Sequence, residues 1–269
     1  MNLFILAAGL GTRLKPLTDT MPKALVPVGG TPLLQLLIEK IRRECSNPEI
    51  VINIHHFADQ IVNFVEAHHS FDLPIRFSDE RQQLLETGGG LKQAAPLFNN
   101  DEPILIHNVD ILSNVHLGAF YRQHADDPEV AATLIVSERT TKRYLLFDDT
   151  NRLVGWTNIE TGEVKSPYAW LRNATLSQLE GNRYSVSSSS LQGGREVNLY
   201  AFSGIHIVSK SLIALMDTWE GKFPIIDFYL SVCHQVIIRA DVRPDLQLLD
   251  VGKLDSLTQA EEMVQKLGL

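Results

Sequence analysis

The fold of this chain is decided by the stretch NLFILAAGLG, residues 2–11. From Leu3 to Ala8 the run is apolar without alternation, a pattern typical of a strand buried on both faces of a parallel sheet. Gly9 and Gly11 then end the strand and open a loop. In α/β proteins such a loop lies at the carboxyl edge of the sheet, where ligands bind.

Helix and strand patterns alternate after this loop. Residues 31–43 carry apolar side chains at helical spacing, with Thr31 as the expected N-cap and Pro32 at the first helical position. Further strands are expected at residues 50–54, 75–77 and 104–107, and further helices at 58–67 and 91–97. This order predicts an α/β fold with a doubly wound (Rossmann-like), mostly parallel sheet.

The second half of the chain is richer in strand patterns. Strands are expected at residues 131–137, 144–147, 153–156, 201–208 and 248–250, and helices from Ser211 and from about Asp255. The runs 144–147 and 153–156 flank the turn formers DDTN, which predicts a hairpin. Residues 173–195 are polar and are interpreted as a long loop or mobile flap. We therefore expect one domain, residues 1–269, with a β-rich insert at about 138–200.

Composition excludes several classes of protein. Hydrophobic residues make up 44% and charged residues 21% of the 269 residues, which excludes disordered, collagen-like and coiled-coil chains. The net charge of −8 argues against a partner that is nucleic acid or an anionic membrane. Cys45 and Cys233 support neither a disulfide framework nor a thiolate metal site. The apolar start is too short to span a bilayer and lacks a basic leader, so we expect a soluble, cytoplasmic protein.

The loop after the first strand carries groups that suit phosphate binding. Gly9 and Gly11 let backbone N–H groups approach an anion closely. Arg13 can donate to two phosphate oxygens, and Lys23 adds a mobile charge. The loop is not the dinucleotide fingerprint, because Leu14 stands at the third glycine position, nor is it a Walker loop. A glycine turn with two surface cations is the alternative that these residues leave open.

Two further features point to ligand chemistry. The stretch ETGGGL, residues 86–91, could let a flat ligand lie against the backbone, with a flexible helix-capping loop as the alternative. Asp110 and Asp250 each close an expected strand and would emerge at the edge that carries the phosphate loop. Two carboxylates with phosphate oxygens and water suit Mg²⁺, although a lone strand-end aspartate often serves a turn.

The histidine pairs at 55–56 and 68–69 lack a chelating spacing.

Residues 6–23 resemble the phosphate loop of the sugar-1-phosphate nucleotidyltransferases, whose pattern is roughly GxGTRLxPLT followed by a Pro-Lys pair. The resemblance implies that Arg13 acts on the departing pyrophosphate and that Lys23 contacts phosphate oxygens near the reacting centre. Residues 108–110 are similar to the family's (N)GD motif, and residues 250–252 to its D-[VI]-G motif. These matches imply an Mg²⁺ ion held by Asp110 and Asp250.

The resemblance also implies a nucleotide site and a sugar site. The stretch LETGGG, residues 85–90, is most similar to the subgroup that contains the N-acetylmuramate-1-phosphate uridylyltransferases, and residues 202–205 to the sugar-contacting AGI strand. The implied nucleotide-binding residues are Ala7, Ala8, Gly9, Gly11, Thr12, Glu80, Thr87 and Gly88. The implied sugar-binding residues are Asn108, Gly155 and Gly204.

Several positions depart from the family pattern. Val109 replaces the usual glycine and is expected to crowd the sugar side, and Lys253 stands where threonine is common. Residues 153–156 occupy the place of a Glu-Lys-Pro motif whose lysine holds the sugar phosphate; no residue matches it, and Lys165 is a candidate for that role. Because only a short segment follows Gly252, we expect no C-terminal β-helix domain.

The implied activity joins a nucleoside triphosphate to a sugar 1-phosphate and releases pyrophosphate, with Mg²⁺ as cofactor. UTP and N-acetylmuramate 1-phosphate are the expected substrates. The alternatives are a mannose- or heptose-1-phosphate guanylyltransferase, a phosphocholine cytidylyltransferase of the same fold, and a nucleotide-sensing paralogue without catalysis. In each case the partners are small molecules, with no nucleic acid and no membrane.

Overall fold

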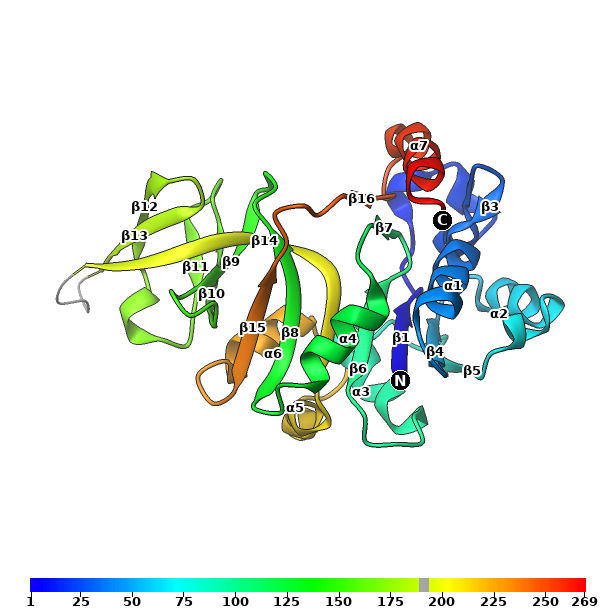
Figure 1. The fold of residues 1–269 in the computed structure, drawn as a ribbon, viewed down its shortest axis with the longest axis horizontal. Coiled ribbons are helices and arrows are strands. Elements are labelled where there is room, and N and C mark those ends of the chain that lie inside the picture. Colours follow the sequence, from blue (N-terminus) through cyan, green and yellow to red (C-terminus); the bar gives the residue numbers. More distant parts are fainter. Residues whose placement is uncertain (189–193) are drawn as a thin grey trace.

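Four parallel strands form one half of the main sheet in a computed structural model, which describes residues 1–188 and 194–269 (Figure 1). They are β1 (Asn2–Leu6), β4 (Glu49–Ile54), β5 (Ile75–Asp79) and β6 (Ile104–Asn108). β1 pairs in parallel with β4 on one side and with β6 on the other, so the winding direction changes at β1. Open α/β sheets bind ligands at such a switch point, beyond the carboxyl ends of the strands.

Helices cover both faces of this half of the sheet. The helices are α1 (Leu33–Glu44), α2 (Ala58–Ala67), α3 (Glu86–Ala94) and α4 (Leu117–Ala125). Leu3 and Ile5 pack with α1, α2 and α4, whereas Phe4 packs with α3 on the opposite face. Because both faces are buried, β1 is apolar without alternation, as expected from its sequence.

A mostly antiparallel half, in which β15 pairs in parallel with β8, continues the sheet beyond β6. It contains β8 (Val130–Ser137), β9 (Arg143–Phe147), β10 (Leu153–Asn158), β11 (Glu163–Lys165), β12 (Thr175–Glu180), β13 (Arg183–Ser187), β14 (Arg195–Val208) and β15 (Ile237–Val242). β14 pairs antiparallel with β6, β8, β9 and β13, and it therefore joins the two halves into one mixed sheet of 12 strands. The α/β class is confirmed, and the hairpin expected around residues 148–151 is formed by β9 and β10.

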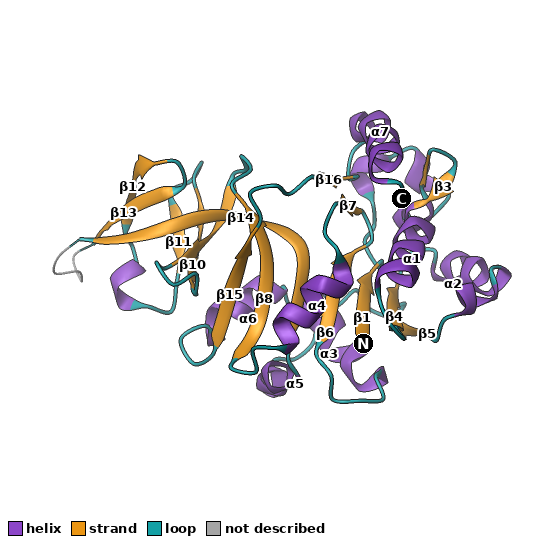
Figure 2. Cartoon of the chain, in the orientation of Figure 1, coloured by secondary structure: helices purple, strands orange, loops and turns teal. Residues whose placement is uncertain are grey.

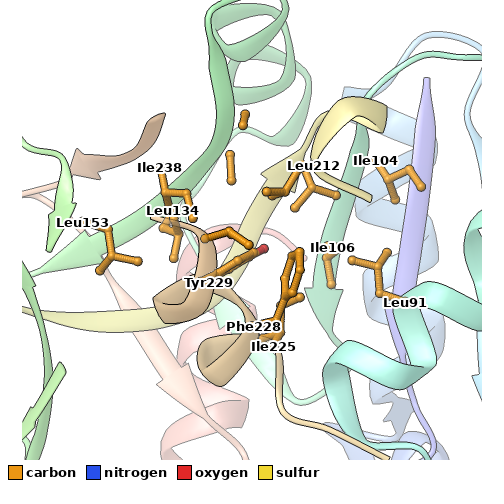
Figure 3. Close-up of a cluster of buried hydrophobic side chains, with 14 of the residues drawn as sticks. Leu91, Ile104, Ile106, Leu134, Leu153, Leu212, Ile225, Phe228, Tyr229 and Ile238 are labelled. Atoms are coloured by element: carbon orange, nitrogen blue, oxygen red, sulfur yellow. The ribbon is translucent and has the colours of Figure 1, made fainter. Parts of the chain in front are cut away.

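The two remaining helices of the sheet pack on the face that α3 covers. They are α5 (Lys210–Ala214) and α6 (Ile225–Val232), which join an apolar cluster with Leu91, Ile106 and Leu134 (Figure 3). Phe228 and Tyr229 of α6 are fully buried there. This cluster holds α6 against both halves of the sheet, which places the first turn of α6 near the edge where ligands are expected.

A separate two-stranded sheet lies at the carboxyl edge of the main sheet. β7 (Ile111–Ser113) follows β6 directly and pairs antiparallel with β16 (Leu248–Asp250). The chain then enters α7 (Leu257–Leu267), which packs with α1 and with the small hairpin of β2 (Pro27–Val28) and β3 (Thr31–Pro32). Figure 2 shows β16, β7 and α7 next to one another on this side of the molecule. The C-terminal segment thus packs beside the loop that follows β1.

Three local predictions were wrong. Thr31 is not the N-cap of α1, because Thr31 and Pro32 extend into β3 and the helix begins at Leu33. The stretch 86–90 is not a loop before a helix but the first part of α3 itself. The segment 173–195 contains β12 and β13, whose mostly exposed side chains gave no alternating pattern; residues 189–193 of the expected flap lie outside the described part of the chain.

The prediction that no segment spans a membrane agrees with the helices that the structure describes. Within residues 1–188 and 194–269, every helix is too short or too polar to cross a bilayer.

Candidate functional site

A cavity of about 440 Å³ lies at the carboxyl ends of β1 and β6, and we call it the switch-point cavity. The residues predicted from sequence that line it are Ala7, Ala8, Gly9, Gly11, Thr12, Arg13, Lys23, Thr87, Asn108 and Asp110. The lining residues that sequence reasoning missed include Asn53, Leu84, Glu86 and Gly252. Segments from both ends of the chain therefore form one site at the position where the topology predicts a ligand.

The two predicted metal ligands come together at the rim of this cavity. Asp110 follows β6 and Asp250 ends β16, and the backbone N–H of Val251 donates to the carbonyl oxygen of Asp110 at 2.8 Å. Lys23 forms an ion pair with Asp110, and its Nζ lies 4.0 Å from Oδ1 of Asp250. Because one ammonium group contacts both carboxylates, the two aspartates share a single site, as the sequence-based hypothesis requires.

Arg13 completes this group of charges. Its Nη2 lies 3.8 Å from Oδ2 of Asp250, and the guanidinium is more than half exposed at the rim of the cavity. A Cβ on Gly252 would lie 2.6 Å from both Arg13 Nη2 and Asp250 Oδ1. A larger residue here would therefore displace the ends of the Arg13 and Asp250 side chains from their present positions.

The environment of Asp250 raises its pKa above the ordinary value. Partial burial is the main cause, and the neighbouring charge of Asp110 adds to it, while Lys23 and Arg13 oppose it. Both causes disfavour the ionised carboxylate, because the charge loses water and faces a like charge. A cation bound between the two carboxylates would relieve both effects.

The donor set formed by Asp110 and Asp250 fits a hard divalent cation. Mg²⁺ prefers oxygen ligands, keeps several waters and commonly uses only one or two carboxylates together with substrate phosphates. Within the described residues no group of three or more His, Cys, Asp or Glu side chains could form an all-protein cage. The pair is thus suited to an ion that arrives with a phosphate rather than to a permanently caged metal.

Asn53 holds the turn that follows β1 in place through side-chain hydrogen bonds. Its Oδ1 accepts hydrogen bonds from the N–H groups of Ala7 at 2.6 Å and Ala8 at 3.1 Å, and its Nδ2 donates to Glu80 Oε1 at 2.7 Å. Glu80 Oε2 in turn accepts from the N–H of Leu85 at 2.9 Å. The signal for Asn53 in the sequence is a single amide within the apolar run at residues 50–54.

This network changes the interpretation of three predicted residues. Ala7 and Ala8 line the cavity, but their N–H groups are already engaged by Asn53. Glu80 is buried behind the wall and does not line the switch-point cavity. Its carboxylate links β5 to the start of α3 through Asn53 and Leu85, so its observed contacts are structural.

The three glycines of α3 lie against protein rather than against open space. A Cβ on Gly88 would overlap the ring of Phe223, and a Cβ on Gly89 would overlap the carbonyl oxygen of Gly221. The N–H groups of Gly88 and Gly89 both point to the carbonyl oxygen of Phe223, at 2.9 and 3.2 Å. The glycines thus allow residues 221–223 to pack on the helix, and the flat ligand surface expected here is occupied by that segment.

The predicted sugar-binding residues separate into two places. Asn108 lines the switch-point cavity, and Gly204, with φ of 79°, lies so close that its Cβ would be 2.7 Å from Asn108 Nδ2. Gly155 lies in β10, outside this cavity. Val109 contributes to the cavity wall and also packs in the apolar cluster beneath α1, and the expected crowding of the sugar side stays a prediction.

Comparisons with known proteins agree with this geometry. Residues 3–149 match the family described as Nucleotidyl transferase. The chain is 39% identical over 150 residues to the N-acetylmuramate alpha-1-phosphate uridylyltransferase of Caulobacter vibrioides, a match that covers 54% of this chain and 61% of that protein. It is 30% identical over 140 residues to the mannose-1-phosphate guanyltransferase of Aspergillus oryzae, with 50% and 38% covered. The match therefore spans less than two thirds of the length of these curated relatives.

A solved structure extends the likeness to the whole described fold. The crystal structure of a putative glucose-1-phosphate thymidylyltransferase from Bacillus anthracis superimposes with a TM-score of 0.74, covering 98% of this chain and 95% of that chain. The sequences are only 15% identical, so this comparison establishes the arrangement of helices and strands and nothing about substrates.

Proposed function

The chain belongs to the nucleotidyl transferase family, and from this premise we propose that it joins a nucleoside triphosphate to a sugar 1-phosphate. The observation that carries the proposal is the convergence of Arg13, Lys23, Asp110 and Asp250 at one cavity. These side chains come from three separate parts of the sequence, and fold alone would not require them to meet. Their charges match the needs of phosphate transfer.

The proposed reaction needs little acid–base chemistry. An oxygen of the sugar 1-phosphate forms a bond to the α-phosphorus of the nucleotide, and the bond from that phosphorus to the bridging oxygen breaks. The electron pair leaves on pyrophosphate, so atoms and charge balance without a general base. The barrier comes from bringing two polyanions together and from charge that builds on the leaving group, which positioning and fixed positive charge can lower.

The positions of the charged side chains in the cavity assign each of them a role in the proposed reaction. Arg13 is exposed at the cavity rim, where its guanidinium can donate two hydrogen bonds to the pyrophosphate as it departs. Lys23 is mostly buried beside Asp110, which places its ammonium where the reacting phosphates would meet. When bound, Mg²⁺ would neutralise phosphate charge, and Asp110 and Asp250 would hold it.

The loop N–H groups that can bind phosphate belong to residues that follow Ala8 in the chain. Within residues 1–188 and 194–269, the N–H groups of Gly9, Gly11 and Thr12 take part in no hydrogen bond to the protein. Gly11 has φ of 62°, a left-handed conformation that glycine adopts at no steric cost. We therefore assign the anion-binding part of the loop to residues 9–12.

UTP and N-acetylmuramate 1-phosphate are the proposed substrates, because two N-acetylmuramate alpha-1-phosphate uridylyltransferases align at 39% and 36% identity. The guanyltransferases that align at about 30% identity support GTP with mannose 1-phosphate as the second candidate. A nucleotide-sensing role is disfavoured, because all four of the charged residues that the chemistry needs are present.

The test is a grid of pyrophosphate-release assays. Four nucleoside triphosphates are each combined with N-acetylmuramate, glucose and mannose 1-phosphates in the presence of Mg²⁺. We expect the fastest release from UTP with N-acetylmuramate 1-phosphate. No release from any pair, together with nucleotide binding by calorimetry, would contradict the proposed activity and favour a sensor.

A further inference from the structure

A small apolar cluster lies next to the charged rim of the switch-point cavity, and we call it the C-terminal cluster. Its buried members are Leu14, Val26, Val28, Leu33, Leu36, Leu112, Val251 and Ala260. These residues are separate from the two large clusters that pack on the faces of the main sheet. A satellite cluster of this kind can open as a local unit while the main core stays folded.

Two charged residues of the rim are each followed directly by a member of this cluster. Leu14 follows Arg13, and Val251 follows Asp250. Leu14 and Val251 are fully buried, whereas the side chains of Arg13 and Asp250 are 59% and 50% exposed. At both places the apolar neighbour therefore fixes the backbone that carries an exposed charge.

The segment that carries Asp110 is held by the same cluster. Leu112 lies two residues after Asp110 in β7, is buried, and pairs with Leu249 of β16. Ile111, between them, packs in the core beneath α1 instead. Consecutive residues of a strand point to opposite faces, so β7 connects the main core on one face to the C-terminal cluster on the other.

The helix α7 covers the C-terminal cluster. Ala260, in the middle of α7, is fully buried, and Leu257, Met263 and Val264 are partly buried against the cluster. Their spacing of three and four residues places them on one face of the helix. α7 also contacts both β2 and β7. One helix thus packs on segments that come from both ends and from the middle of the chain.

Ion pairs alone do not explain why the charged segments lie together. The guanidinium of Arg13 is 3.8 Å from the carboxylate of Asp250, and both side chains are at least half exposed. Exposed ion pairs contribute little, because water solvates both charges and the side chains lose freedom. Partial burial and then the like charge of Asp110 raise the pKa of Asp250, so the two carboxylates disfavour each other's ionised form. Apolar packing supplies the attraction that the charges lack.

We propose that α7 acts as a latch: Leu14, Leu112 and Val251 are positioning residues, and the docked helix holds the charged segments beside them in the geometry that the reaction needs. The catalytic part of this inference rests on the proposed function. Loss of packing in the C-terminal cluster would let the three segments shift together. A misplacement of about 1 Å can lower a rate by about 10²-fold, so such a shift would impair turnover.

Hydrogen–deuterium exchange tests whether the segments form one unit. The N–H of Leu14 donates to the carbonyl oxygen of Gly11 at 2.9 Å, and that of Val251 to Asp110 at 2.8 Å. Together with the helical N–H groups of α7, these amides report on each segment. Val251→Ala removes buried apolar surface from the cluster, and exchange of all these reporters should accelerate together by about tenfold or more.

Val208→Ala is the matched control. Val208 is also fully buried, but it belongs to a main core cluster and pairs with Ile104 at the start of β6, away from the cavity. This variant should lower the free energy of global unfolding and leave the exchange of the reporters unchanged.

Val28→Ala tests the coupling from a second place in the cluster. Val28 lies in β2, apart from the charged residues, so faster exchange at Leu14 and Val251 in this variant must pass through the cluster. This measurement also serves where Val251→Ala does not fold. Reporters that respond separately, or not at all, in Val28→Ala would overturn the latch.

Steady-state pyrophosphate release tests the positioning role. Val251→Ala should lower kcat about tenfold and raise KM for the nucleotide less, because the positions of the charged groups act mainly on the transition state. Val251→Ile, which keeps the D-[VI]-G pattern, should retain turnover, and Val208→Ala should keep kcat. Wild-type kcat in a Val251→Ala protein whose reporters exchange faster would overturn the positioning role.

Failure of the latch and failure of the proposed activity give different results. Exchange requires no substrate, so coupled acceleration supports the latch even if the wild type turns over no pair of substrates. The positioning role is then measured by calorimetric titration with UTP and Mg²⁺. Binding should weaken in Val251→Ala and stay unchanged in Val208→Ala. Equal binding by all forms, or none by the wild type, would overturn the positioning role.

Discussion

The switch-point cavity and a second cavity of about 550 Å³ on the face of β9, β10 and β11, which we call the strand-face cavity, are built in different ways. The first is shaped by backbone loops that buried polar groups hold from behind, as Asn53 and Glu80 hold the turn after β1. The second is a face of paired strands whose charged side chains reach into solvent. The difference indicates that the switch-point cavity, where we propose that phosphate chemistry occurs, is preorganised, whereas side chains of the strand-face cavity can change without rebuilding the fold.

This contrast predicts different consequences of substitution. Changes behind the switch-point cavity should affect activity and folding together, because the same hydrogen bonds serve both. Changes of the charged side chains on the strand face should leave the stability of the fold unchanged, because these side chains reach into solvent. The predictions below concern the first cavity and run from the largest expected effect to the smallest.

Replacement of Arg13 by alanine should cause the largest loss. We expect turnover to fall by about 10²-fold or more, equivalent to roughly 2.7–4 kcal/mol in the transition state, because a fixed charge on the leaving group is removed. Steady-state pyrophosphate release measures the loss, and an unchanged melting curve shows that the fold is kept. Lys15→Ala is the control, because Lys15 pairs with Asp19 at 2.9 Å and does not line the cavity. Wild-type turnover by folded Arg13→Ala would contradict the assigned role.

Asn53→Ala should reduce both stability and activity. It removes the acceptor for the N–H groups of Ala7 and Ala8 and leaves the buried carboxylate of Glu80 without its Asn53 donor. Unsatisfied buried groups cost about 1–3 kcal/mol each, so the free energy of unfolding in urea should fall by at least that amount. A variant with normal stability and impaired turnover would show that Asn53 acts on the ligand instead.

Gly89→Ala should destabilise the protein although alanine favours helices. The propensity gain is about 1 kcal/mol, but the added Cβ overlaps the carbonyl oxygen of Gly221, and overpacking of this kind costs about 1–3 kcal/mol. Urea unfolding gives the net change. Gly194→Ala, where a Cβ would meet nothing within 4 Å, serves as the control and should be close to neutral. Stabilisation by Gly89→Ala would mean that residues 221–223 can move away from α3.

Asp250→Asn should change the stability of the fold least of these variants. It should raise stability, whereas Asn53→Ala and Gly89→Ala lower it. Because the pKa of Asp250 is raised in the folded protein, its ionised form opposes folding, so the variant should melt at a higher temperature than the wild type at pH 8. As the pH falls through the raised pKa, Asp250 of the wild type becomes protonated, and the difference in melting temperature between the wild type and the variant should narrow. Melting curves from pH 8 to pH 4 measure it; a difference that widens toward low pH would contradict the assigned direction. Turnover should nevertheless fall, because a proposed Mg²⁺ ligand is lost.

The elements that were predicted best from the sequence are those whose structure depends mainly on their own residues. α2 begins and ends at the expected residues, and the apolar run after Met1 forms β1 at the centre of the parallel strands. The approach of Asp110 to Asp250 was implied by the family motifs but could not be derived from spacing. It depends on the antiparallel pairing of β7 with β16, two short strands far apart in the chain.

The antiparallel half was predicted less well, for a physical reason. The strands β12 and β13 are stabilised by cross-strand pairing with one another and with β14, and most side chains of β12 are exposed. Without burial on one face there is no alternation to detect, so residues 175–187 were interpreted as a loop. The roles of Gly88 and Gly89 were missed for a related reason, because their packing partners lie on a distant segment.

β14 has a consequence for the length of the acceptor. Phe202 in one cavity wall and Gly204 behind Asn108 in the other belong to the same strand, so at most about 7 Å of main chain separates them. Phe202 pairs with Val136 of β8 and Ile205 pairs with His107 of β6, while the register of β14 against β8 shifts between Phe202 and His206. In the proposed site this short interval would set how far a bound sugar reaches toward the nucleotide, while changes of the surrounding side chains would alter which sugar fits.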